Sequence, residues 1–387
     1  MNDREKSANG GNRIEFRLAN KAMPVVAAGL RKALVSGAID TLSARCVSFF
    51  RDHRDGPAIL VGALPFDRRA ADFLYQPAEF TRVYGLPKLG NGATTAGVKG
   101  RLIAEPPADA YARAVSASLA LMAEDGMALA KVVLSRSLRL EAASVDLFAL
   151  MRRLGADPLV TTFLTPLCAV GNRWLVGATP ELLVSKRGEE VLSHPLAGSA
   201  RRDVDPQRDR QSGEALLASD KDRREHRMVA ETILDVLAPL CAELSAPEGM
   251  TLSQTASMWH LGTRIRGRLR DRDTPVAELL ARLHPTPAVC GLPRERAAQV
   301  IAALEGYDRG FYAGAVGWMD AGGDGDWYVS LRCAEVAGRT MRLFAGAGIV
   351  PGSDPAAETD ETSAKFQAIL AALGMDENGR ALSEDAA

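Results

Sequence analysis

Two carboxylates and a lysine near the C-terminus are spaced to share one face of a helix. Glu358, Glu361 and Lys365 lie at positions i, i+3 and i+7 of a segment, 355–373, for which Asp354 is a suitable N-cap. Two interpretations are open. The first is a solvated helix with a Glu361–Lys365 ion pair. The second is a site for a divalent cation beside an anionic ligand.

Small residues directly before this helix favour the second interpretation. Gly346 and Gly348 follow an apolar strand, and a ligand could lie directly on backbone amides that carry so little side chain. Arg332 lies within another apolar segment, 327–336, which reads as a strand. Its guanidinium suits bidentate binding of a carboxylate or phosphate, although an outward-facing arginine of a sheet is an equally good interpretation.

A second carboxylate pair begins the segment 221–244, which has the apolar periodicity of a helix. Extending its apolar stripe towards the N-terminus leads to Glu225 and Asp222. Carboxylates on a buried stripe need a partner, unless the start of the helix is simply exposed. Both helices could offer oxygen ligands to one cation, and because the chain has no Cys/His cluster, Mg²⁺ is the expected ion.

Two further ionisable residues stand beside apolar segments. Lys131 begins an alternating, β-branched strand, 130–140, and Glu181 follows a Gly-Ala-Thr-Pro turn. Taken alone, Lys131 reads as a charge on an edge strand and Glu181 as a surface charge at a strand end. A lysine or a carboxylic acid in such a position can also serve as a general base or acid.

Composition and length limit the class of protein. The 387 residues carry a net charge of −1, which gives no electrostatic reason to expect nucleic acid or an anionic membrane as a partner. No apolar run is long enough to span a membrane, and the polar N-terminus is no signal peptide. The five cysteines are dispersed, which predicts reduced thiols and a cytoplasmic location.

Nine motifs occur along the chain in the order of one family. They are KVVLSR, GATPELL, HPLAGSARR, SDKDRREH, MWHLGT, HPTPAVCGLP, FYAGAVGW, SLRCAEV and LFAGAGIV followed by ETDETSAK. This set resembles the chorismate-utilising enzymes: isochorismate synthases, salicylate synthases, anthranilate synthase large subunits and aminodeoxychorismate synthases. The resemblance spans about residues 107–373, and the first hundred residues match only weakly.

The resemblance implies one α+β domain, residues 14–374, in which two antiparallel sheets are sandwiched between helices. The two ends of the chain, 1–13 and 375–387, read as disordered tails by their composition. The resemblance also implies chorismate as the substrate and Mg²⁺ as the cofactor. By match of motif, Glu225 and Glu361 would be the metal ligands, and Asp222 and Glu358 would lie beside metal-bound waters. Lys131 would be the general base and Glu181 the general acid. The substrate carboxylates would be bound by Arg332, Lys365 and the amides of Gly346 and Gly348, and His260 would lie near the enolpyruvyl group.

Three positions point to one branch of the family. Ala197 stands where aminodeoxychorismate synthases have a nucleophilic lysine, and Ala288 is similar to isochorismate synthases rather than salicylate synthases. Lys131 favours water over ammonia as the nucleophile, so no glutaminase subunit is expected. The prediction is a monomeric isochorismate synthase for siderophore, salicylate or menaquinone biosynthesis. The alternatives are a salicylate synthase, which also eliminates pyruvate, and a non-catalytic chorismate-binding homologue.

Overall fold

The computed structural model describes residues 14–19, 24–82, 98, 100–125, 128–142, 144–376 and 379–380. The predicted N-terminal tail, 1–13, lies outside the described residues, as do 377–378 and 381–387 of the predicted C-terminal tail. Met375 is only 2% exposed, so the described chain is still packed one residue beyond the predicted end of the domain.

Among the described residues, seventeen strands are joined in one continuous antiparallel network that divides at the strand β1 (Glu15–Ala19), which pairs with β2 on one side and β7 on the other. The two parts on either side of β1 are called the two large sheets below. In order of pairing, the first sheet contains β1, β2 (Val25–Ala33), β4 (Phe73–Arg82), β3 (Ile59–Leu64), β17 (Ala315–Asp320), β18 (Gly325–Val329), β9 (Leu182–Arg187), β10 (Glu190–His194), β15 (Ile265–Leu269) and β12 (Cys241–Ser245). The second continues from β1 through β7 (Thr161–Pro166), β8 (Arg173–Thr179), β19 (Cys333–Ala337), β20 (Thr340–Ile349), β6 (Lys131–Ala142) and β5 (Gly100–Glu105), with β16 (Gly291–Leu292) also on β6. The predicted α+β class with antiparallel sheets is confirmed.

A separate three-stranded sheet completes the architecture. It consists of β11 (Leu196–Arg201), β14 (Met258–Thr263) and β13 (Met250–Gln254), with β14 in the middle. Its strands β11 and β14 pack against α4 (Pro206–Ala218) and α5 (Asp220–Leu237). This small sheet therefore brings the segments around Ala197 and His260 next to the helix that carries Glu225.

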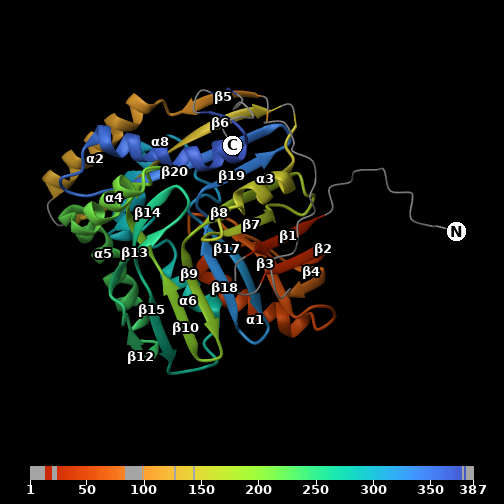
Figure 1. Cartoon of the computed structure of the whole chain (residues 1–387). Coiled ribbons are helices and arrows are strands. Elements are labelled where there is room, and N and C mark those ends of the chain that lie inside the picture. The colour runs from red at the N-terminus through yellow and green to blue at the C-terminus, as the bar shows by residue number, and fades with distance from the viewer. Residues whose placement is uncertain are drawn as a thin grey trace.

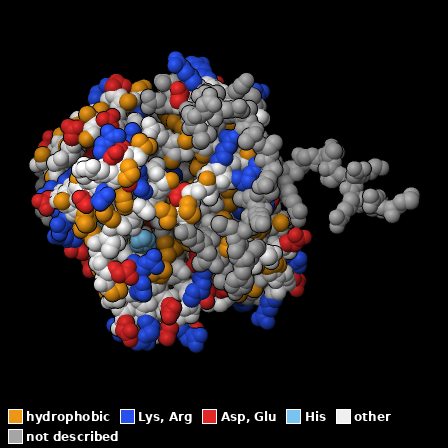
Figure 2. All heavy atoms as spheres, in the orientation of Figure 1, with side chains coloured by type: hydrophobic (Ala, Val, Ile, Leu, Met, Phe, Trp, Pro, Cys, Tyr) orange, Lys and Arg blue, Asp and Glu red, His pale blue; other side chains and the backbone are white. Residues whose placement is uncertain are grey.

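The remaining helices cover the two large sheets (Figure 1). They are α1 (Leu42–Asp52), preceded by the 3₁₀ turn Ile39–Thr41, α2 (Ala108–Asp125), α3 (Leu147–Leu154), α6 (Val276–Leu283), α7 (Arg294–Leu304) and α8 (Pro355–Ala372). Helix α6 packs on β9 and β18, whereas α8 and α2 pack on β20 and β6. None of the helices among the described residues is long and apolar enough to cross a membrane. Acidic and basic side chains are interspersed over the face shown in Figure 2.

Two predicted elements that carry site residues are confirmed. Helix α8 begins at Pro355, and the carboxylate of its N-cap, Asp354, accepts a 2.8 Å hydrogen bond from the amide of Ala357. Strand β6 begins at Lys131, as the alternation of side chains predicted. Its first eight residues are all buried, because the strand is covered on both faces. Lys131 is thus a core residue and not the charge of an exposed edge.

Two predicted boundaries are wrong. The helix expected over 221–244 ends at Leu237, and Cys241–Ser245 forms the strand β12 on β15. The strand expected over 327–336 is broken between β18 and β19, because the chain passes there from the first large sheet to the second. Arg332 lies in this crossing with a φ of 45°, a backbone conformation that a continuous strand does not contain.

Candidate active site

A cavity lies where the two large sheets and the small sheet meet. Of the twelve predicted site residues, nine line it: Glu181, Glu225, His260, Ala288, Arg332, Gly346, Gly348, Glu361 and Lys365. Lys131, Asp222 and Glu358 lie behind this lining. The lining combines apolar residues with charged groups of both signs, as expected for the binding site of a small polar molecule.

Glu181 is the buried carboxyl of the cavity, held in the tight turn between β8 and β9. It is 2% exposed, and its amide donates a 3.2 Å hydrogen bond to the hydroxyl of Thr179. Burial raises the pKa of Glu181 to about 8, although the charges of Lys131 and Lys365 oppose that rise. The carboxyl therefore holds its proton at neutral pH and can donate it.

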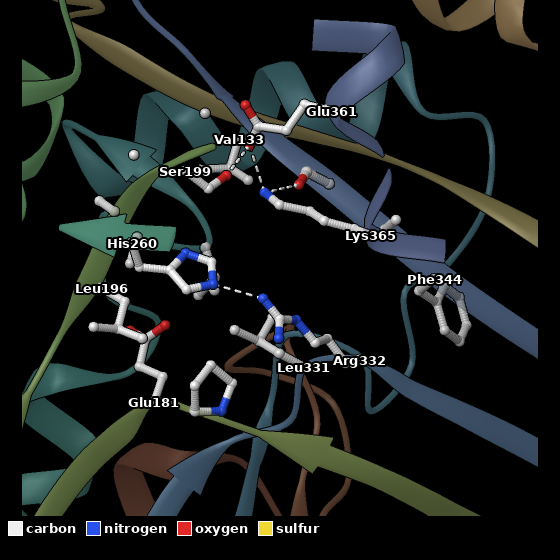
Figure 3. Close-up of a pocket in the computed structure, with 18 of the residues that line it drawn as sticks. Val133, Glu181, Leu196, Ser199, His260, Leu331, Arg332, Phe344, Glu361 and Lys365 are labelled. Carbon is white, nitrogen blue, oxygen red and sulfur yellow. Dashed lines mark hydrogen bonds and ion pairs between the residues drawn. The ribbon is translucent and has the colours of Figure 1, made fainter. Parts of the chain in front are cut away.

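His260 and Arg332 form a second polar unit, drawn with a dashed line in Figure 3. A guanidinium nitrogen of Arg332 donates to Nε2 of His260 over 2.6 Å, and another donates to the hydroxyl of Thr255 over 3.0 Å. Burial and the adjacent Arg332 hold the pKa of His260 well below its usual value. The imidazole is consequently neutral, with Nε2 as an acceptor.

Arg332 brings a positive charge into the cavity that no carboxylate among the described residues neutralises by an ion pair. Burial lowers its pKa to about 10, which still leaves the guanidinium protonated at neutral pH. Its two hydrogen-bond partners, Thr255 and His260, are both uncharged. A half-buried cation with neutral partners is a suitable binding group for an anionic ligand.

Lys131 is fully buried behind Glu225. Its Nζ lies 3.0 Å from Oε1 of Glu225, but makes no hydrogen bond of acceptable geometry within the described part of the chain. Gly348 of β20 packs against this pair: a Cβ atom there would come within 2.0 Å of Oε1 of Glu225 and 3.0 Å of Cε of Lys131. A glycine at 348 therefore leaves the room that the Glu225 carboxylate occupies.

The predicted loop at Gly346 and Gly348 is instead part of β20, where these residues pair with Ser135 and Val133 of β6. The carbonyl of Gly346 accepts a 2.8 Å hydrogen bond from Nζ of Lys365. The same ammonium donates to Oε1 of Glu361 over 2.6 Å, which confirms the predicted ion pair.

Glu361 receives a second bond from the hydroxyl of Ser199, at 2.7 Å, and Figure 3 shows the two bonds converging on its carboxylate. Burial opposes the ionised form of Glu361, but Lys365 and Ser199 outweigh it and hold its pKa below the usual value. Ser199 was not among the predicted site residues, although it belongs to the motif PLAGS. Ser199 of β11 thus links the small sheet to the carboxylate of Glu361 on α8.

Asp222 and Glu358 lie beside the cavity and meet at Lys221. Nζ of Lys221 donates to Oε1 of Glu358 over 2.6 Å and lies 4.0 Å from Oδ1 of Asp222. Burial, together with the negative charge of Glu361, raises the pKa of Glu358 despite the ammonium of Lys221. This lysine precedes Asp222 in the motif SDKDRREH but was given no role from the sequence.

The donor set fits a divalent cation, although the side chains are not arranged around one. No group of three or more His, Cys, Asp and Glu residues in the described part of the chain is placed to hold a metal. Instead, Glu225, Glu358 and Glu361 each pair with a lysine. These carboxylates already balance buried positive charge, and their oxygens are the ligands that Mg²⁺ takes.

An aromatic pair that the sequence did not single out closes the cavity near Gly346. Tyr312 and Phe344 stack with their ring centroids 4.8 Å apart and their planes 5° from parallel, and both line the cavity. Tyr312 belongs to the motif FYAGAVGW, but neither a charge nor a characteristic spacing distinguished this residue within the motif. The stack offers an apolar wall to a ring-shaped ligand.

The family model of chorismate binding enzymes matches residues 92–374. The chain belongs to the chorismate binding enzyme family. The chain is 41% identical to the isochorismate synthase DhbC of Bacillus subtilis over 87% of each chain. The structure superimposes on DhbC of Bacillus anthracis with a TM-score of 0.87 and 37% identity, covering 95% of this chain and 98% of that one.

A second solved relative is named for menaquinone biosynthesis. The menaquinone-specific isochorismate synthase MenF of Escherichia coli aligns with a TM-score of 0.80 and 25% identity, over 96% of this chain and 92% of that one. The isochorismate synthase EntC of Escherichia coli is 39% identical, over 82% of this chain and 81% of that one. The likeness to the solved relatives therefore covers nearly all of this chain, and includes described residues from the first hundred positions, which matched only weakly by motif.

Proposed function

We propose that this protein is an isochorismate synthase, which converts chorismate to isochorismate by adding water at C2 and removing the C4 hydroxyl. The observation that carries the proposal is Glu181, a carboxyl that holds its proton at neutral pH inside a cavity that also contains the unneutralised Arg332. Relatives that carry this name match at about 40% identity over most of the chain, which supports the same conclusion.

The cations of the cavity would bind the two carboxylates of chorismate. Arg332 offers a planar guanidinium, and Lys365 offers an ammonium that already bonds a carboxylate, that of Glu361. The neutral His260 holds Arg332 in place and would lie near the enolpyruvyl group. Gly346 and Gly348 of β20 line the cavity without adding a side chain to it.

Proton transfer would use the two buried groups of opposite type. Glu181 would give its proton to the departing C4 hydroxyl, so that water and not hydroxide leaves. Lys131 would accept a proton from the water that attacks C2. No net proton is consumed, because one is donated and one accepted per turnover.

Glu225 and Glu361 would hold Mg²⁺, with Asp222 and Glu358 beside its bound waters. The ion would supply positive charge to a carboxylate of the substrate. Glu225 of α5 and Glu361 of α8 both line the cavity, and each is paired with a lysine.

Product analysis tests the proposal directly. The protein is incubated with chorismate and Mg²⁺, with and without EDTA, and the products are identified by NMR. We expect isochorismate in equilibrium with chorismate, and loss of conversion on chelation. Salicylate plus pyruvate would instead assign the salicylate synthase activity, and no conversion, even with ammonia added, would leave a chorismate-binding protein. The cytoplasmic location, the monomeric state and the pathway that uses the product stay predictions.

A further inference from the structure

Lys221 occupies the centre of the negative charge on α5 and α8. Its ammonium lies 2.6 Å from Oε1 of Glu358 and 4.0 Å from Oδ1 of Asp222, and it also interacts electrostatically with Glu225 and Glu361. These four residues, Asp222, Glu225, Glu358 and Glu361, are called the carboxylate cluster below. One ammonium therefore interacts with all four carboxylates of two helices.

The carboxylate cluster needs this charge. Glu358 is 2% exposed, and the negative charge of Glu361 lies near it. Burial and this repulsion both disfavour the ionised carboxylate, so an ionised Glu358 without a cation would be costly. The Lys221–Glu358 contact joins residues 137 positions apart and links α5 to α8. An internal cation thus stabilises the arrangement in which the carboxylates face one another.

We infer that the ammonium of Lys221 takes the place of a divalent cation in the carboxylate cluster, and that it moves out when the cation binds. The inference rests on the proposed function for the identity of the cation, Mg²⁺. It assigns Lys221 as a positioning residue, which keeps the carboxylate cluster assembled between turnovers and competes with the metal for it.

Lys221 is the lysine best placed to leave. Its side chain is 28% exposed and lies in the first turn of α5, whereas Lys131 is completely buried. Lys365 is held by a second bond, to the carbonyl of Gly346. The four-carbon stem of Lys221 can turn towards solvent without disturbing the helix, and hydration then compensates the lost ion pair.

The inference predicts the sign of a mutational effect on metal affinity. Like charges repel each other strongly at such short distances, so an ammonium in the carboxylate cluster opposes the binding of a divalent ion. Lys221→Gln should therefore tighten Mg²⁺ binding by about tenfold or more. A lysine that only supports the metal ligands from outside would have the opposite effect, because its removal would weaken binding.

The experiment is a titration of the full chain with Mg²⁺ alone, followed by calorimetry at about pH 8, and repeated with Mn²⁺ followed by electron paramagnetic resonance. We expect Lys221→Gln to lower the Kd for both ions. It should also lower the melting temperature without metal and increase the rise in melting temperature that Mg²⁺ produces. Lys221→Arg keeps the charge and should leave the Kd at or above the wild-type value.

The matched control is Lys32→Gln, an exposed lysine on β2, which should not alter the Kd. An unchanged or higher Kd in Lys221→Gln would overturn the inference, as would the absence of metal binding in every variant. Because the titration contains no chorismate, it is independent of turnover. Tighter binding by Lys221→Gln in a protein that does not convert chorismate would refute the proposed function and leave this inference in place.

Discussion

Nζ of Lys131 lies 3.0 Å from Oε1 of Glu225, and both residues are buried. The expected general base and an expected metal ligand are thus ion-paired with each other, with the carboxylate on the cavity side. A cation that draws Glu225 away would break this ion pair, so the expected metal site and the expected proton acceptor are coupled through one contact.

Replacing Lys131 tests its role as the base. Lys131→Ala should lower kcat by a factor of about 100 to 10 000, the range typical of general-base catalysis, and should leave the Kd for chorismate nearly unchanged. Steady-state kinetics and calorimetric binding measure the two quantities. Lys186→Ala is the matched control, because Lys186 is equally buried and ion-paired, to Asp324 at 2.8 Å, but lies outside the cavity lining. An undiminished kcat in Lys131→Ala would exclude the assigned role.

The raised pKa of Glu181 makes the stability of the protein depend on pH. Unfolded Glu181 loses its proton near 4.5, whereas the folded protein retains it up to about 8. The folded state therefore binds the extra proton between these values, and the free energy of unfolding falls as the pH rises through this window. Glu181→Gln cannot ionise, so its stability relative to wild type should increase from pH 5 to pH 8.

Urea denaturation at the two pH values measures this difference. The exposed carboxylate Glu278, paired with Arg282 on α6, supplies the control variant Glu278→Gln, for which the difference should be nearly constant. A stability gap between Glu181→Gln and wild type that does not change with pH would mean that Glu181 is ionised in the folded protein.

Substitution of Arg332 should act on substrate binding. Arg332→Gln removes the unneutralised cation of the cavity and should raise KM about 100-fold, since a buried charge contact is worth several kcal/mol. Arg332→Lys keeps the charge but loses the fork that bonds Thr255 and His260, so an intermediate KM is expected. Arg187→Gln, at an ion pair with Asp326 that lies outside the cavity lining, should leave KM unchanged. Equal KM values in all variants would show that Arg332 does not contact the substrate.

A methyl group at residue 348 should disrupt the site without altering any charge. The Cβ atom of Gly348→Ala would lie 2.0 Å from Oε1 of Glu225, so the carboxylate must move away from Lys131. We expect a loss of turnover of at least about 100-fold. Gly322→Ala is the control, because its Cβ atom would approach nothing closer than Oδ1 of Asp320, at 3.3 Å. Wild-type kinetics in Gly348→Ala would show that the position of Glu225 is not important.

Glu361→Gln should abolish the stabilisation of the protein by Mg²⁺. A ligand at 100 times its Kd stabilises the folded state by about 2.7 kcal/mol, which appears as a rise in melting temperature. Glu361→Gln removes one expected ligand, so this rise should disappear, whereas Glu243→Gln at the surface pair with Arg268 should retain it. An undiminished rise in Glu361→Gln would place the metal elsewhere.

Local signals in the sequence were sufficient for the elements that carry most of the site. The cap at Asp354 and the alternation after Lys131 correctly predicted the starts of α8 and β6. Nine separate residues that the motifs of the family pointed to line one cavity. These predictions depend either on residues that are neighbours in the sequence or on the motifs of a known family.

The missed features depend on distant parts of the chain. The residues 327–336 all favour a strand, and only the crossing between the two large sheets imposes the positive φ of Arg332. Apolar residues after Leu237 fit either a helix or a strand, and the pairing with β15 decides for the strand. Lys221 reads as a surface lysine until α8 brings Glu358 to it.

The most direct test of the central claim is the origin of the oxygen at C2 of the product. Chorismate is converted by the protein in H₂¹⁸O with Mg²⁺, and the isochorismate is analysed by mass spectrometry and by the ¹⁸O-induced shift of the C2 signal in ¹³C NMR. Attack by water assisted by Lys131, with departure of the C4 hydroxyl protonated by Glu181, predicts ¹⁸O at C2. Isochorismate without ¹⁸O at C2 would show that the hydroxyl migrates within the substrate, and would contradict this account.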